Sequence, residues 1–130
     1  MTPYDANGFD PPAPLAGVSL RHPGTGLTVT DVRMLIDSGA DVTLVPQASV
    51  NRLGVTVNAG EAYELMGFDG SRSTAQAAQL DLLFLRRTFR GRFLLIDQEW
   101  GILGRDVLNH LPILLNGPML SWGEQSQTGP

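Results

Sequence analysis

Residues 34–41 read Met34-Leu35-Ile36-Asp37-Ser38-Gly39-Ala40-Asp41: an apolar run that ends in a carboxylate, a small hydroxyl residue and a glycine. Read as a strand that runs into a tight turn, this stretch places Asp37 at the end of a buried segment. An ionised carboxylate there is costly unless it is paired, hydrogen-bonded or protonated. Gly39 allows a backbone conformation or a close approach that a side chain would block. An Asp-Ser-Gly tripeptide is also an ordinary turn, but a polar break in a core pattern is where function is expected.

Outward from this turn, the chain reads as a series of short strands with two small helices. Alternating apolar residues over 15–21 and 27–32 predict a hairpin whose second strand continues to Asp37. A short helix is predicted over 46–54, with Pro46 in its first turn and Gly54 at its end. The remaining predicted elements are strands over 42–45, 77–85, 90–96 and 102–103, hairpins over 63–71 and 113–122, and a helix over 104–111. This pattern is typical of an all-β barrel or sandwich.

Composition narrows the class of protein. A chain of 130 residues with 42% hydrophobic and 17% charged residues is expected to form one globular domain, over 15–122, with flexible tails over 1–14 and 123–130. The formal net charge of −4 disfavours nucleic-acid binding. The absence of cysteine excludes disulfides, thiolate catalysis and Cys-ligated metal. No apolar run is long enough to span a membrane and no signal peptide is recognisable, so a cytoplasmic location is expected.

A second stretch of sequence, read together with the Asp37 turn, indicates a protein family. Residues 102–108 read Ile102-Leu103-Gly104-Arg105-Asp106-Val107-Leu108, and a glycine-containing hairpin lies between this stretch and the Asp-Ser-Gly-Ala turn. The two stretches, in this order, resemble the retropepsin-like aspartic proteases, the family of retroviral proteases and their cellular and bacterial relatives. The resemblance covers roughly residues 15–122. It implies a small closed barrel-like all-β fold with one or two short helices, which functions as a symmetric homodimer.

The resemblance also implies roles for individual residues. The catalytic turn would comprise Asp37, Ser38 and Gly39, with the Ser38 hydroxyl locking two active-site loops together. Arg105 would support the turn by pairing with Asp41, and residues 65–70 would form the flap. The flap is poorer in glycine than the retroviral ones. Substrate would contact residues on the strands, the turn and the flap: Leu35, Ala40, Asp41, Met66, Gly67, Phe68, Trp100 and Ile102.

One aspartate cannot perform this chemistry alone, and the sequence contains no second Asp-Ser/Thr-Gly. The second carboxylate is therefore expected from another copy of the chain across a two-fold axis. Two carboxylates so close share one proton, which allows the pair to activate water without a covalent intermediate and predicts an acidic to mildly acidic optimum. The expected substrate is a polypeptide with apolar side chains near the cut. No metal-ligand spacing is present, so neither metal nor cofactor is expected.

Other functions are compatible with parts of this sequence. The chain could be a catalytically silent module of the same fold that dimerises or binds peptides. Arg105 and Asp41 could be an exposed ion pair of little value, and Trp100 could be a core residue. A phosphate-binding ATPase also places Asp-X-Gly at a strand end, but that fold needs a far longer chain.

Overall fold

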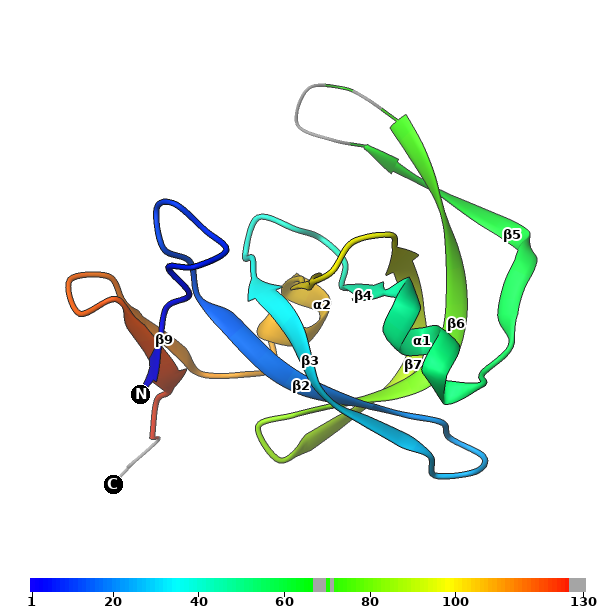
Figure 1. The fold of residues 1–130 in the computed structure, drawn as a ribbon, viewed down its shortest axis with the longest axis horizontal. Coiled ribbons are helices and arrows are strands. Elements are labelled where there is room, and N and C mark those ends of the chain that lie inside the picture. Colours follow the sequence, from blue (N-terminus) through cyan, green and yellow to red (C-terminus); the bar gives the residue numbers. More distant parts are fainter. Residues whose placement is uncertain (67–69, 71, 127–130) are drawn as a thin grey trace.

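The computed structural model describes residues 1–66, 70 and 72–126, which form ten strands and two short helices (Figure 1). Among these residues, none of the helices has the length and apolar character needed to cross a membrane. In chain order the elements are β1 (Thr2–Pro3), β2 (Leu15–Arg21), β3 (Thr28–Ile36), β4 (Leu44–Pro46), α1 (Gln47–Leu53), β5 (Val57–Met66), β6 (Arg72–Phe84), β7 (Arg87–Ile96), β8 (Gly101–Leu103), α2 (Arg105–Leu108), β9 (Ile113–Asn116) and β10 (Ser121–Glu124).

Six of the described strands close into a small barrel. Hydrogen-bonded neighbours follow the order β2-β3-β8-β4-β7-β6, and β6 pairs back onto β2 through the register Ser19↔Leu83, Leu20↔Leu82 and Arg21↔Asp81. Closure of this kind removes the free edges of the sheet. β5 pairs with β6 outside the ring, and the two strands extend together away from the barrel (Figure 1). The expected all-β, closed barrel-like fold with two short helices is confirmed.

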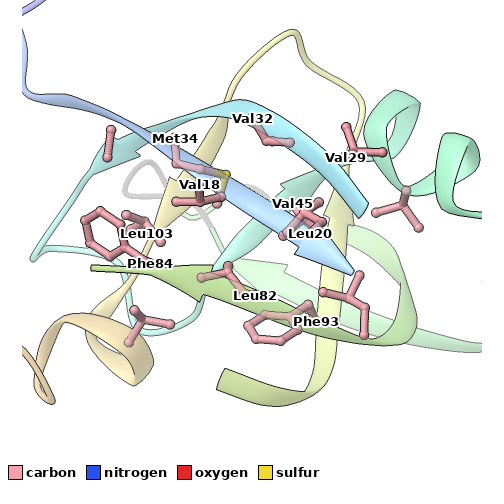
Figure 2. Packing of buried hydrophobic residues seen from close by; sticks show 14 of the residues in the cluster. Val18, Leu20, Val29, Val32, Met34, Val45, Leu82, Phe84, Phe93 and Leu103 are labelled. Atoms are coloured by element: carbon pink, nitrogen blue, oxygen red, sulfur yellow. The ribbon is translucent and has the colours of Figure 1, made fainter. Parts of the chain in front are cut away.

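Apolar side chains from alternate strand positions fill the barrel. On β2, Ala16, Val18 and Leu20 are buried, while the intervening Gly17 is exposed and Ser19 is half-buried, as the two-residue period of a strand requires. Burying one such aliphatic side chain contributes about 1.5–3 kcal/mol. Side chains from β2, β3, β4, β6, β7 and β8 pack together in the core. Figure 2 labels, among them, Val18, Leu20, Val32, Met34, Val45, Leu82, Phe84, Phe93 and Leu103. Ile36, the last residue of β3, belongs to this core, so the packing positions the turn that follows β3 at Asp37.

Helix α1 confirms the prediction made for residues 46–54. Pro46 is its N-cap, and Gly54 is its C-cap in the left-handed conformation, with φ 71°. This backbone region suits glycine, which has no Cβ to clash. Val50 and Leu53 form the buried face of the helix.

Several element boundaries differ from the prediction, among them those of β4, which covers 44–46 rather than 42–45, and β6, which begins at residue 72 rather than 77. α2 ends at Leu108 rather than at residue 111, and tight turns follow it. The β6–β7 turn consists of Leu85 and Arg86 rather than residues 86–89, and both have positive φ, 51° and 64°. The β9–β10 connection spans residues 117–120 rather than the Asn-Gly pair alone. The pairing of β6 with β7 continues to Phe84↔Arg87, which leaves only two residues for the turn. Strand pairing therefore overrides the turn preference of the local sequence.

Strand β1 of the N-terminal segment joins β9 and β10 in a second, three-stranded sheet with the order β1-β10-β9 (Figure 1). Trp122 on β10 anchors this sheet to the barrel, because its ring packs 6.0 Å from that of Phe84 and its Nε1–H donates to Leu15 O at 3.3 Å. Between β1 and β2, Asp5 and Ala13 form an isolated β-bridge. The flexibility expected for residues 1–14 and 123–130 in solution stays a prediction.

Candidate active site

The Asp37 turn begins where β3 leaves the barrel. Asp37 N–H donates to Leu103 O at 3.1 Å, and Ala40 N–H closes the turn onto Asp37 O at 3.1 Å. The Asp37 carboxylate accepts a hydrogen bond from Gly39 N–H at 2.9 Å through Oδ1. Asp37 and Ala40 are half-buried, while Ser38 and Gly39 are exposed. The turn therefore holds one oriented carboxylate at the surface of the single chain.

The two sequence stretches are neighbours in the barrel. β3 and β8 pair in parallel, with Leu35 opposite Ile102 and Ile36 opposite Leu103. The segment that follows β8 passes so close to the residues after the turn that a Cβ on Gly104 would lie within 2.5 Å of the Val42 carbonyl. Glycine is required at this position because no side chain fits.

Arg105, the first residue of α2, is bonded to the turn through its side chain and its backbone. Its Nη1–H donates to Ser38 O at 2.7 Å, and its Nη2 forms an ion pair with Asp41. The Arg105 backbone N–H donates to Ala40 O at 2.9 Å. The structure thus brings together Arg105 and the turn residues to which the sequence assigned support and catalysis.

Sequence reasoning missed a second brace, built from Thr43 and Asp106. Thr43 is 1% exposed, and its hydroxyl donates to Asp106 Oδ1 at 2.6 Å while it accepts from Gly104 N–H at 3.0 Å. Thr43 N–H also donates to Asp106 Oδ2 at 3.1 Å. The available signal was a hydroxyl residue within the otherwise apolar strand predicted over 42–45, since a buried hydroxyl needs partners.

The structure brings together only some of the residues assigned to substrate contact. Leu35 and Ile102 lie side by side and half-buried on β3 and β8. Trp100 is half-buried, and its ring contacts that of Phe9 at a centroid distance of 4.9 Å. Phe9 was not predicted, because it lies in a segment without periodicity. Of the residues predicted to contact substrate from the flap, Met66 is described only by its backbone, which ends β5. The Met66 side chain, Gly67 and Phe68 lie outside the described residues.

Other features of the described chain lie away from this turn. A surface hollow is lined by residues of the N-terminal segment and of β2 and β3, including Tyr4, Asp5, Asn7, Gly17, Asp31 and Arg33, but by no residue of the Asp37 turn. In the part of the chain that the structure describes, no three acidic or histidine side chains are grouped to hold a metal ion.

A closed β-barrel whose Asp-Ser-Gly turn is braced by an Ile-Leu-Gly-Arg segment defines the retropepsin-like class of aspartic proteases. A family model described as aspartyl protease matches residues 20–107, which is more than half of the chain and includes the first stretch and all but the last residue of the second. The chain belongs to this aspartyl protease family.

A solved structure gives the same result. The EIAV protease complexed with the inhibitor HBY-793 matches with a TM-score of 0.56 and 25% sequence identity, over 75% of this chain and 86% of that chain. No curated protein sequence matches the chain. The family and the structural likeness together support aspartic protease activity in general terms.

Proposed function

We propose that this protein is a homodimeric aspartic endopeptidase, which hydrolyses peptide bonds with water activated between two Asp37 carboxylates, one from each copy. The observation that carries the proposal is a braced, surface-facing Asp-Ser-Gly turn in a chain whose sequence contains that motif once. A mechanism with two aspartates needs two such turns, so one chain supplies half of the site.

The chemistry follows from the shared proton. The ionised carboxylate removes a proton from the water, whose oxygen attacks the carbonyl carbon of the scissile bond. The protonated carboxyl donates its proton to the carbonyl oxygen, which gives a tetrahedral diol. Collapse of the diol transfers a proton to the leaving nitrogen, breaks the C–N bond and returns one proton to the pair. The net reaction consumes one water and forms no covalent bond to the protein.

A surface suited to the second copy lies on the terminal sheet. β9 is an edge strand of the described sheet, and its Leu114 and Leu115, on opposite faces, are 43% and 49% exposed. The adjacent loop adds Met119 and Leu120, which are 72% and 48% exposed. An apolar edge strand left open to water tends to pair with another chain. In our proposal, β9 of one copy pairs with β9 of the other, which brings two Asp37 turns to one site.

The substrate side of the site is apolar. Leu35, Ile102 and Trp100 are half-buried, so each retains surface that a side chain of the substrate can cover. The proposed substrate is therefore a polypeptide with apolar residues beside the cut, since such residues gain most from burial against these side chains.

Cleavage by an Asp37→Asn variant tests the proposal. The amide cannot act as a general base, so turnover of a peptide library should fall by about 10²–10⁴-fold or more. Asp31→Asn is the matched control, because Asp31 is an exposed aspartate on β3, the strand that leads into the turn, and its change should leave turnover unaltered. Undiminished turnover in Asp37→Asn would refute the proposed chemistry. A wild-type protein that binds apolar peptides but cleaves none would be a binding module of the same fold.

A further inference from the structure

The N-terminal segment reaches the candidate site through one aromatic contact. The rings of Phe9 and Trp100 lie 4.9 Å apart between centroids, with their planes inclined by 52°. Trp100 immediately precedes β8, whose first residue, Gly101, pairs with Met34 on β3, the strand that ends just before Asp37. Phe9 therefore packs on a residue at the border of the proposed substrate site.

The loop that carries Phe9 is held closed at its base. Asp5 N–H donates to Ala13 O at 2.8 Å, and Ala13 N–H donates to Asp5 O at 3.1 Å. The Asp5 carboxylate also accepts hydrogen bonds from the backbone N–H groups of Gly8, at 3.2 Å, and Asn7, at 2.8 Å, which lower the pKa of Asp5. Closed, internally bonded loops of this length often carry functional residues.

The far end of this loop is fixed beside the catalytic turn. Pro14, the residue after the bridge, accepts a hydrogen bond through its carbonyl from Ile36 N–H at 3.0 Å. Ile36 directly precedes Asp37 in the sequence. The loop is thus tied to the same strand end that positions the carboxylate, and the position of Phe9 is set relative to it.

We propose that Phe9 is a specificity-determining residue, which forms with Trp100 an aromatic wall for an apolar side chain of the substrate next to the cut. This inference rests on the proposed function and adds a residue to its substrate side. Both rings are half-buried, so the pair retains exposed aromatic surface rather than closing on itself. Two tilted rings offer a large and rigid apolar surface, which favours bulky aliphatic or aromatic side chains over alanine.

The test compares peptides that differ only in the side chain beside the cut: Phe, Leu or Ala. Phe9→Ala should raise KM for the Phe and Leu peptides about tenfold relative to the Ala peptide, with kcat changed less than about twofold, because the wall is lost. Phe9→Leu should restore part of the preference. Phe89→Ala is the matched control, since Phe89 is a half-buried aromatic on β7 whose ring contacts His110 at 6.1 Å. It should leave the preference unchanged.

A second measurement separates this inference from the proposed function. In Asp37→Asn protein, which binds without cleaving, the same peptides are titrated with and without Phe9→Ala. Cleavage by the wild type with a preference that Phe9→Ala does not alter would overturn the role of Phe9 and leave the proposed function intact. Peptide binding that discriminates through Phe9, without any cleavage by the wild type, would overturn the function and retain the wall. A rise in kcat/KM for all peptides on Phe9→Ala would also overturn the wall, because Phe9 would then be obstructing the site.

Discussion

Arg105 and Ser38, which lie 67 positions apart in the sequence, are joined by a hydrogen bond of 2.7 Å from the guanidinium Nη1 to the serine carbonyl oxygen. The same guanidinium pairs with Asp41, and the Arg105 backbone N–H donates to Ala40 O. Three of the four residues after Asp37, namely Ser38, Ala40 and Asp41, are therefore held by one residue of α2. Because a catalytic carboxylate must be positioned closely, this brace should affect turnover more than folding.

Arg105→Lys tests the brace. Lysine keeps the charge but lacks the planar fork that reaches two acceptors at once. We expect kcat to fall about 10–100-fold with a smaller change in KM, since small displacements of catalytic groups have effects of this size. Arg86→Lys is the control, because the Arg86 side chain is 89% exposed and its pair with Glu124 is a surface ion pair of little energetic value. A kcat for Arg105→Lys equal to that of the wild type would show that the brace is dispensable.

Thr43→Val tests the second brace. Valine has nearly the shape of threonine but leaves the Gly104 N–H without its acceptor and removes one hydrogen bond to Asp106. The free energy of unfolding should fall by about 1–3 kcal/mol, which urea denaturation at neutral pH can measure. Thr88→Val, at an exposed position of β7, should change stability by less than about 0.5 kcal/mol. Equal stability of the two variants would mean that Thr43 only fills space.

Asp81→Asn tests the closure of the barrel. Asp81 is fully buried at the seam between β2, β6 and β7, where Arg90 Nε–H donates to its carboxylate at 2.8 Å and Arg21 Nη2–H at 3.0 Å. The hydrogen bond from Arg90 is the main cause that holds the pKa of Asp81 below its ordinary value of 3.8; burial opposes it, and Arg21 adds to it. The asparagine variant should lose about 1.5–3 kcal/mol of unfolding free energy at neutral pH.

The sign of the pH dependence follows from the lowered pKa of Asp81. Its stabilising contribution is complete at pH values above the carboxyl range of the unfolded chain and declines as the pH falls through the lower folded-state pKa. The stability difference between wild type and Asp81→Asn should therefore shrink at strongly acidic pH. Two pH profiles that run parallel down to the acid limb would contradict this role. Because the folded-state pKa is low, the seam should persist at the mildly acidic pH at which the shared proton of the catalytic pair is expected.

Leu115→Glu tests the surface proposed for the second copy. A charge at this edge strand should prevent pairing of two β9 strands, so the protein should become monomeric by light scattering and lose cleavage. Leu27→Glu is the matched control, since Leu27 is 52% exposed in the β2–β3 turn. It should remain dimeric and active. A Leu115→Glu protein that is folded, dimeric and active would place the interface elsewhere.

The parts of the site that the sequence predicted are those carried by short contiguous patterns. The Asp37 turn and the segment around Arg105 each have a distinctive local composition, and the structure brings them together through β3 and β8. Alternation along the strands predicted an all-β barrel or sandwich, because burial of one strand face imposes a period of two residues. The family resemblance implied the closed barrel.

The parts that escaped prediction depend on contacts between distant residues. Nothing in the sequence around Phe9 indicates Trp100 as its partner, because the N-terminal segment has no periodicity. The Leu85–Arg86 turn has positive φ at residues that rarely adopt it, and its position is set by the pairing of β6 with β7. Local propensity cannot report such tertiary constraints.

The most direct test of the central claim, that two copies of Asp37 make one site, is the activity of mixtures of wild-type and Asp37→Asn chains. At constant total concentration and after full exchange of subunits, random pairing leaves about one quarter of the dimers with two wild-type chains in an equal mixture. We predict about one quarter of the wild-type activity in that mixture, with a quadratic dependence on the wild-type fraction. Activity of about one half, linear in the wild-type fraction, would contradict the claim, because each chain would then act as a complete site.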